Sequence, residues 1–399
     1  GHFGPVRLAR TFREEGFDRH AQRQRQGMQP GGRDAVLPAL VLLHLLEADS
    51  DALGERRLRQ AQGGPSGGDP QADGLVDLAV NVRVTEPPQW LRDAITSTEH
   101  DWARYPDATP GREALAAMHG VPTDMVLPTA GAAEAFPLVS ALEPCHAVVV
   151  HPQFTEPEAA LRVAGINVAR HILKASDGFA LDPALVPDNA DLVIVGNPTN
   201  PTGRLHPATD LLALRRPGRI LVIDEAFMDA TDESQSLIGC DMDGLLVLRS
   251  LTKTYGLAGI RAGYVIGDRR LIARLADHQT PWSVSTPAIA AMIACTCEEA
   301  RRFQTKLCDD IPAARADLVE RLTVLGLSVV TSEAPFVLVD TSSLSGKSIR
   351  QPLAKRGFAV RRGETFPGLG PTWIRLAVRD PEIHAELARA ISDLTAQHN

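Results

Sequence analysis

Short runs of apolar residues recur along the chain from Leu75 onward, each bounded by polar or turn-forming residues. Four of these runs are continuous rather than alternating: "HAVVVHP" (146–152), "DLVIVGNP" (191–198), "RILVIDEA" (219–226) and "LLVLRSLTK" (245–253). Continuous apolar runs of this length predict strands that are buried on both faces. Since helical segments lie between the runs, we predict an α/β fold in which helices cover both faces of a mostly parallel central sheet.

Polar residues gather where these predicted strands end. "NPTNPTG" (197–203) follows one strand, Asp224 ends the next, and Lys253 follows the third, while the small-residue turn "TAGAAEAF" (129–136) leads into a predicted helix. Taken singly, each has an ordinary structural reading: an Asn-Pro turn, a helix cap or a tight connection. Their order and placement together predict a site at the carboxyl edge of the sheet, where open α/β sheets bind ligands.

The first 74 residues have a different composition. Residues 1–34 are rich in arginine and glutamine, and residues 62–74, "QGGPSGGDPQADG", are typical of a flexible linker. The apolar run between them, "AVLPALVLLHLLEA" (35–48), predicts one helix; it is too short to span a bilayer and contains a proline. It also follows a long charged stretch, so we do not expect a secretory signal. Residues 1–74 therefore form a predicted N-terminal extension.

Composition limits the classes of function. The chain has 399 residues with 44% hydrophobic and 23% charged residues, and its net charge of −8 argues against nucleic acid or an anionic membrane as partner. Its five cysteines form no C-x-x-C motif, which indicates neither a disulfide framework nor a zinc site, so we expect a cytoplasmic protein. There are only five lysines beside thirty-six arginines. A lysine at a buried strand end, Lys253, is therefore conspicuous.

The motifs "NPTNPTG", "VIDEAF" and "SLTKTYGLAGIRAGY" stand in the order and spacing of a known family. Over residues 75–399 the chain resembles fold-type I pyridoxal phosphate enzymes of the class I/II aminotransferase superfamily. It is most similar to histidinol-phosphate aminotransferases and to cobalamin-pathway threonine-phosphate decarboxylases. The resemblance implies a large cofactor-binding domain and a smaller α+β domain. The expected divisions are an arm with part of the small domain (75–120), the large domain (121–298) and a C-terminal small domain (299–399).

The resemblance also implies a role for each residue around the cofactor ring. Lys253 would form the Schiff base with the cofactor aldehyde and then move the proton at the substrate Cα. Burial beside a cationic arginine would keep part of its amine neutral. Asp224 would hold the pyridine nitrogen protonated, and a buried carboxylate needs such a cation. Asn200 would bind the ring 3′-oxygen, and Phe154 would stack on the ring, unless it is a core residue.

Further residues would hold the cofactor phosphate. The backbone amides of Ala132 and Ala133 lie at a predicted helix N-terminus, which suits a dianion. Ser250 or Thr252 would supply a hydroxyl, and Arg261 a guanidinium fork.

Tyr105 in "RYPD" resembles a residue that reaches the phosphate in the partner's active site, so the resemblance implies a homodimer with shared active sites. On the substrate side, Arg375 in "TWIRLAVRD" matches the arginine that grips the α-carboxylate, and Asn81 in "DLAVNVRV" matches an asparagine that lines the substrate. Four more arginines have two possible readings. They could form a second anion site for a phosphorylated substrate, or they could simply lie on the surface: Arg83, Arg104, Arg361 and Arg362.

Two departures keep the reaction open. Phe227 stands where most relatives have a tyrosine that donates to the 3′-oxygen, and "NVRVTEPP" replaces the usual "N-x-N-P-x-G" segment. We expect an aminotransferase that acts at the Cα of an amino-acid-like substrate. Decarboxylation of a phosphorylated amino acid is the alternative, favoured by "DEAFMD" (224–229). Cβ or Cγ chemistry is less favoured, and it stays open because the residues around the cofactor serve any of these reactions.

A different class of function is a transcription regulator, in which a DNA-binding domain precedes a cofactor-sensing aminotransferase fold. The first 70 residues have about the right length. They lack evenly capped helices with a turn between them, however, and their basic and acidic residues nearly balance. We therefore favour the enzyme.

Overall fold

The computed structural model describes residues 74–82, 84 and 86–396. The predicted N-terminal extension, with its expected helix (35–48) and all but the last residue of its linker (62–74), lies outside the described residues, as does Arg83.

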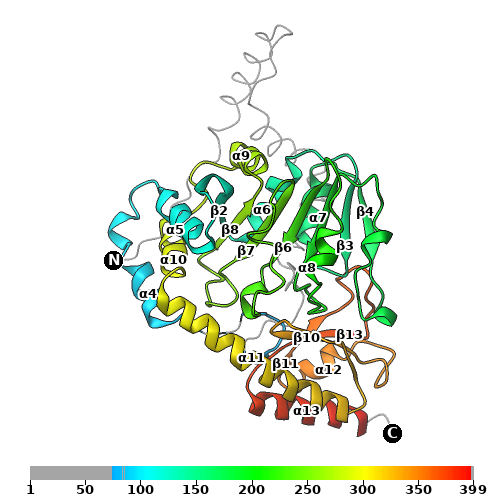
Figure 1. Ribbon diagram of the computed structural model, residues 1–399. Coiled ribbons are helices and arrows are strands. Elements are labelled where there is room, and N and C mark those ends of the chain that lie inside the picture. Colours follow the sequence, from blue (N-terminus) through cyan, green and yellow to red (C-terminus); the bar gives the residue numbers. More distant parts are fainter. Residues whose placement is uncertain (1–73, 83, 85, 397–399) are drawn as a thin grey trace, which may run out of the picture. The chain divides into compact units, whose positions relative to one another are not determined.

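A seven-stranded sheet forms the centre of the described part of the chain (Figure 1), with strand order β2-β8-β7-β6-β5-β3-β4. Only β8 runs antiparallel to its neighbours. The predicted α/β class with a mostly parallel sheet is confirmed. The strands are β2 (Val126–Ala130), β3 (Ala147–His151), β4 (Val168–Ile172), β5 (Leu192–Gly196), β6 (Ile220–Asp224), β7 (Leu245–Ser250) and β8 (Ala262–Gly267).

Each of the four continuous apolar runs contains one of these strands, and β3, β5 and β7 are buried along their whole length. Alternate side chains enter opposite apolar clusters: Val193 and Val195 belong to one, Leu192 and Ile194 to the other. Burial on both faces explains why these strands read as continuous rather than alternating runs.

Helices cover both faces of the central sheet (Figure 1). One face packs against α6 (Ala132–Ser140), α7 (Glu156–Val163) and α9 (Arg269–His278). The other packs against α4 (Gln89–Thr96), α5 (Thr109–His119), α8 (Ala208–Leu212) and α10 (Thr286–Ala294). The 3₁₀ helices are η1 (Glu99–Asp101), η2 (Thr123–Met125), η3 (Ala175–Asp177), η4 (Pro183–Leu185) and η5 (Met228–Ala230).

A smaller antiparallel sheet, which we call the small sheet, has the strand order β12-β13-β10-β9. Its strands are β9 (Ser328–Val329), β10 (Phe336–Asp340), β12 (Arg361–Arg362) and β13 (Trp373–Ala377). Beside it, β1 (Val76–Asp77) pairs with β11 (Phe358–Ala359). A third apolar cluster joins these strands to α11 (Glu298–Val324), α12 (Arg350–Ala354) and α13 (Pro381–Ala396). The smaller α+β part expected from the resemblance is therefore present.

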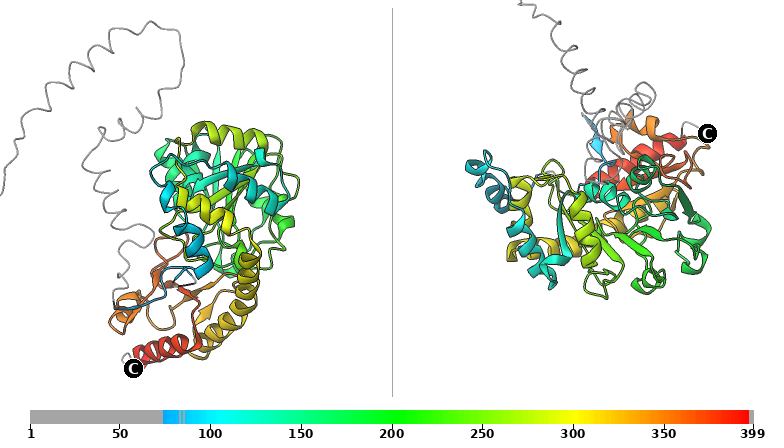
Figure 2. Two further views of the ribbon diagram at one scale, coloured as in Figure 1. Left: turned by 90° about the vertical axis from the view of Figure 1, so that its left-hand side faces the viewer. Right: turned by 90° about the horizontal axis from the view of Figure 1, so that it is seen from above.

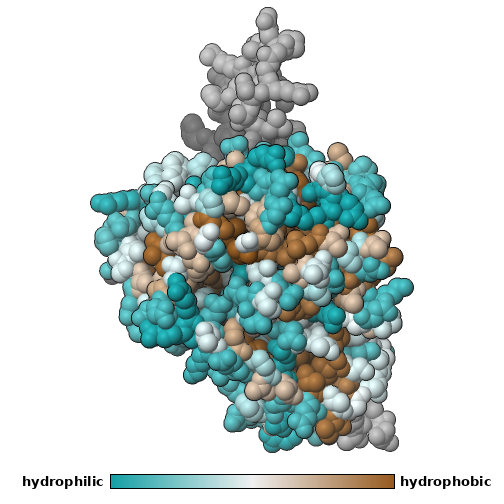
Figure 3. Space-filling model, in the orientation of Figure 1, coloured by the Kyte–Doolittle hydropathy of each residue, from teal (hydrophilic) through white to brown (hydrophobic). Residues whose placement is uncertain are grey.

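The long helix α11 lies beside α13 (Figure 2) and buries only one stripe of residues: Ala300, Ile311, Leu318 and Leu322. Its outward face is largely hydrophilic (Figure 3). The segment 75–120 is divided, because β1 joins the strands next to the small sheet whereas α4 and α5 pack against α10. The domain boundaries themselves stay a prediction.

Candidate active site

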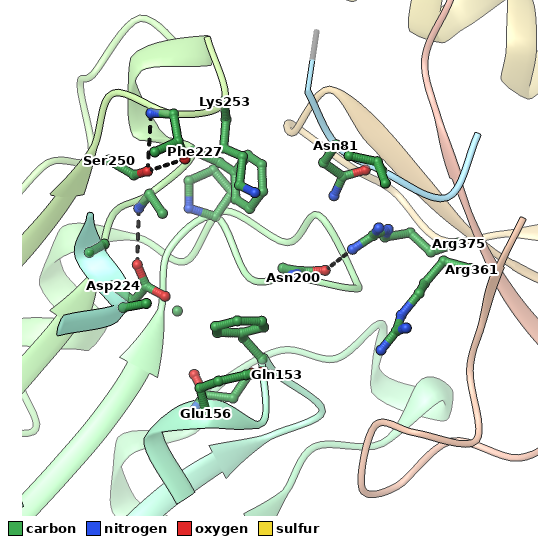
Figure 4. A pocket seen from close by; sticks show the side chains of 18 of the residues that line it. Asn81, Gln153, Glu156, Asn200, Asp224, Phe227, Ser250, Lys253, Arg361 and Arg375 are labelled. Carbon is green, nitrogen blue, oxygen red and sulfur yellow. Dashed lines mark hydrogen bonds between the residues drawn. The ribbon is translucent and has the colours of Figure 1, made fainter. Parts of the chain in front are cut away.

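A cavity of about 390 Å³ lies where the carboxyl ends of the central strands face the small sheet (Figure 4). All of the predicted site residues except Tyr105 line it. They are Asn81, Ala132, Ala133, Phe154, Asn200, Asp224, Ser250, Thr252, Lys253, Arg261 and Arg375. The cavity therefore lies at the carboxyl edge of the parallel strands, where the sequence predicted a ligand site.

Asp224 is the last residue of β6 and faces the cavity. One of its carboxylate oxygens accepts a hydrogen bond from the backbone amide of Ala226, at 3.1 Å. Burial raises the pKa of this carboxyl to about 6, against the opposing effects of that hydrogen bond and of Lys253. A carboxylate in this place binds best to a cationic or N–H group, which would restore its charged form.

Lys253 follows β7 and borders the same cavity. Burial, and then the guanidinium groups of Arg375 and Arg261, lower the pKa of its amine to about 8. A substantial fraction of the amine is therefore neutral just above neutral pH, as a nucleophile or base requires.

A set of anion-binding groups converges at the start of α6. Gly131 precedes this helix with a positive φ of 75°, and no side chain caps the helix's first turn. The Arg261 guanidinium packs so close to Gly131 that a Cβ there would lie 2.8 Å from Nη2. The hydroxyls of Ser250 and Thr252 are 2.8 Å apart on the same cavity. Free backbone amides, two hydroxyls and a guanidinium suit a phosphate dianion.

The opposite wall of the cavity carries two arginines of the small sheet. Arg375 of β13 is buried and donates hydrogen bonds to Asn200 Oδ1, at 2.5 Å, and to the carbonyl oxygen of Ala79. Arg361 of β12 stands opposite Arg375 in the strand register and also lines the cavity. Two adjacent guanidinium groups make this wall suited to an anionic ligand.

Several lining residues were not predicted from the sequence: Phe136, Gln153, Glu156 and Phe366. Gln153 and Glu156 flank Phe154 just after β3, so the same strand-end rule could have found them. Burial raises the pKa of the Glu156 carboxyl. Phe366 belongs to the loop between β12 and β13, and no motif marks it.

Tyr105 lies elsewhere. Its side chain is 77% exposed and stacks on the exposed ring of Trp282, with 4.3 Å between ring centroids. Its contribution to a partner's site stays a prediction. Of the other candidate arginines, Arg104 forms a surface ion pair with Asp101, and Arg362 is not among the lining residues.

Asn197 and Glu225 have structural surroundings. The Asn197 side chain donates to the His206 carbonyl at 3.2 Å and accepts from the His206 amide at 2.7 Å, which fixes the loop after β5. Glu225 pairs with Arg249 at 3.0 Å and accepts a hydrogen bond from the Leu237 amide, outside the cavity.

Within the described ranges, no group of histidine, cysteine and acidic side chains is arranged to hold a metal ion. The helices of this part of the chain include none with the length and apolarity needed to cross a membrane.

Comparison with known proteins agrees with these observations. The family model for class I and II aminotransferases matches residues 73–391. This chain belongs to that family. The predicted family and enzyme class are therefore confirmed.

Among its relatives is a histidinol-phosphate aminotransferase of Mycobacterium tuberculosis, which is 46% identical over 312 residues, covering 77% of this chain and 85% of the relative. A threonine-phosphate decarboxylase of Pseudomonas aeruginosa is 35% identical over 329 residues, covering 77% and 91%. The fold resembles the crystal structure of histidinol-phosphate aminotransferase from Sinorhizobium meliloti in complex with pyridoxal 5′-phosphate, with a TM-score of 0.72, 20% identity, and coverage of 82% and 92%. The expected fold is confirmed as well.

Proposed function

We propose that the protein is a pyridoxal phosphate-dependent aminotransferase that acts at the Cα of a phosphorylated, amino-acid-like substrate. The observation that carries this proposal is the meeting of Lys253, Asp224 and Arg375 on one cavity. These residues supply an amine nucleophile, an acidic group and a carboxylate-binding guanidinium, which come from three different strands or strand ends.

The cavity fits the cofactor on its own chemistry. The groups around the start of α6 suit the phosphate, and the Asp224 carboxyl, whose pKa burial raises to about 6, would gain a cationic partner in a protonated ring nitrogen. The Phe154 ring offers an aromatic surface on the same cavity. When bound, pyridoxal phosphate supplies an aldehyde that captures an amine and a ring that accepts the electrons of a broken Cα bond.

Three residues then divide the chemical work. Lys253 would be the base that takes the proton from the substrate Cα, which its lowered pKa favours. Asp224 would keep a proton on the ring nitrogen of the bound cofactor. Arg375 grips the substrate carboxylate and thereby sets the orientation of the bonds at Cα, on which the outcome depends at the ångström scale.

Two observations favour a phosphorylated substrate. Arg361 lies beside Arg375 on the cavity wall, so the wall can neutralise two anionic groups or one dianion. The relatives named above act, by their names, on phosphorylated compounds.

Decarboxylation of a phosphorylated amino acid is a second candidate. It is favoured by Phe227, which lines the cavity in place of the usual tyrosine, and by the likeness to the Pseudomonas aeruginosa decarboxylase. The decisive experiment mixes the cofactor-loaded protein with a panel that includes histidinol phosphate and phosphothreonine. Transfer of the amino group to a keto acid supports the aminotransferase. Release of CO₂ with no amino transfer would overturn it.

We further propose a homodimer in which Tyr105 lies nearer the partner's active site than its own. The exposure of Tyr105 and of Trp282 supports this, because two exposed, stacked aromatic rings are typical of an interface. Sedimentation at the concentrations used for activity tests the assembly. A monomer with full activity would contradict it.

A further inference from the structure

The carboxamide of Asn81 is buried, and no hydrogen-bond partner for it lies within residues 74–82, 84 and 86–396. The residue is 6% exposed, and neither Nδ2 nor Oδ1 has a hydrogen-bond partner among the described residues. It lies between β1 and α4, two residues after Ala79, whose carbonyl oxygen is bound by Arg375. A buried amide whose hydrogen-bonding atoms are unused is destabilising, so it points to a group that it binds at some stage of function.

The amine of Lys253 has complementary needs. The structure gives it no hydrogen bond or ion pair within the described part of the chain, although it is a donor and carries a charge when protonated. The side chains of Lys253 and Asn81 both project into the cavity from different segments of the chain (Figure 4). One residue therefore has an unused acceptor, and its neighbour has unused donors.

The same two residues also border a second, smaller cavity of about 10 Å³. This is roughly the space that one water-sized group occupies. Thr254 borders it too, and its hydroxyl interacts with the Asp229 carboxyl, whose pKa it lowers. The remaining lining residues are apolar: Phe227, Ala230, Leu307, Ile311 and Pro335. In this apolar setting, Asn81 is the polar neighbour that remains for the amine.

We propose that Asn81 holds the free amine of Lys253: a rotation of the flexible lysine side chain brings the amine to Oδ1 of Asn81, which accepts a hydrogen bond from it while the lysine is not bonded to the cofactor. The proposal rests on the proposed function in one respect: that function requires the Lys253 amine to be released from the cofactor and later bound to it again. The two side chains are not hydrogen-bonded to each other in this structure, and the proposed contact forms between residues of this chain without any cofactor atom.

The charges around Lys253 explain what an uncharged partner would add. Arg375 on β13 and Arg261 before β8 oppose the ammonium form, whereas Asp224 on β6 and Glu156 on α7 favour it. A carboxamide stabilises the ammonium through one hydrogen bond without adding a charge. The amine could then accept a proton from Cα and still release it, and its four-carbon chain would be held in one place.

The test measures protonation of Lys253 in the cofactor-free protein. Acetic anhydride acylates only neutral amines, and mass spectrometry of the Lys253 peptide over a pH series gives the midpoint of labelling. Asn81→Leu removes the acceptor, which destabilises the ammonium, so the midpoint falls by about one pH unit, a tenfold change in the neutral fraction. Asn81→Asp adds a negative charge, so the midpoint rises by about one unit or more.

Two controls calibrate the measurement. Asn167→Leu, at an exposed site, leaves the midpoint unchanged. Arg375→Leu removes the strongest opposing charge and raises it. Circular dichroism establishes that each variant is folded, and Asn81→Ser, whose shorter side chain withdraws the acceptor, replaces Asn81→Leu if that variant is not, with the same lowered midpoint.

An unchanged midpoint in the folded variant that lacks the acceptor would overturn the proposal, and a raised KM for substrate in that variant would assign Asn81 to the substrate instead. Because no cofactor or substrate is present in the labelling, its result is separate from the identity of the reaction.

Discussion

The two sides of the cavity are built in different ways. The side that holds Asp224, Asn200 and Lys253 consists of the ends of neighbouring parallel strands, whose positions are fixed by the hydrogen-bond ladder of the central sheet. The side that holds Arg361 and Arg375 comes from the small antiparallel sheet, together with the chain segment around Asn81. Under the proposed function, the first side would serve the cofactor whichever bond is broken, and the second would meet the substrate. Fixing the chemistry and choosing the substrate would then belong to different sheets.

The largest effect is expected on the cofactor side, at Lys253. Lys253→Ala removes both the nucleophile and the base, so we expect activity to fall by about 10⁴-fold or more. Treatment with borohydride should fix the cofactor to Lys253 in the unaltered protein and to no residue in the variant. Lys347→Ala, at an exposed position, is the matched control and should behave like the unaltered protein. Labelling of a different lysine would contradict the assignment.

Asp224→Asn comes next, because it keeps the shape of the side chain and removes its charge. Without the carboxylate the ring nitrogen is not held protonated, and kcat should fall by about 10²–10³-fold. Steady-state kinetics with saturating cofactor measures this. Asp229→Asn is the matched control, since Asp229 is also buried in "DEAFMD" but does not line the cavity. Equal losses in the two variants would mean that burial, rather than contact with the cofactor, explains the effect.

On the substrate side, Arg375→Leu should act mainly through binding. Removing one partner of a buried charged contact costs about 2–5 kcal/mol, so KM for a carboxylate substrate should rise by about 10²-fold. Arg375→Lys should recover only part of this, because an ammonium cannot bind both carboxylate oxygens in a fork. Spectra should show cofactor still bound in both variants. Loss of the cofactor itself would break the division between the two sides.

The pH dependence of cofactor uptake tests the cofactor side of the cavity alone. Burial and two guanidinium groups give Lys253 a pKa of about 8, and only the neutral amine attacks an aldehyde. The rate of cofactor uptake by the cofactor-free protein should therefore rise about tenfold per pH unit below 8 and level off above it. Absorbance after rapid mixing follows the uptake. A plateau that begins well below pH 8 would show that the amine is less protonated than its surroundings imply.

The contrast also explains what could be predicted from the sequence. Asp224 and Lys253 were found because parallel strands leave their polar ends at one edge, and a continuous apolar run marks each strand. Phe366 was not found, because its place on the cavity depends on how the loop after β12 folds back, which no local pattern records. Arg361 was one of four candidate arginines, and only its register opposite Arg375 distinguishes it from Arg362 and Arg104.

The smallest expected effect concerns Phe227, the residue that departs from the family pattern on the cofactor side. Phe227 is buried and packs edge-on against Phe336, with 5.0 Å between centroids, and Phe336 lies beneath the Arg375 guanidinium. Phe227→Tyr would return a hydroxyl to the cavity. One hydrogen bond contributes about 1 kcal/mol, so we expect kcat to change by about fivefold or less, with a shift in the pH dependence of cofactor absorbance.

Phe366→Tyr is the matched variant on the substrate side, since Phe366 lines the same cavity. The centre of its ring lies 5.2 Å from the guanidinium carbon of Arg361. It should change KM for a phosphorylated substrate and leave cofactor absorbance unaltered. The informative quantity for both variants is the ratio of amino transfer to CO₂ release. If the cofactor side only supplies chemistry common to all outcomes, Phe227→Tyr leaves this ratio unchanged. A changed ratio would mean that the missing tyrosine hydroxyl helps to choose which Cα bond breaks, and the choice of reaction would then belong to both sheets.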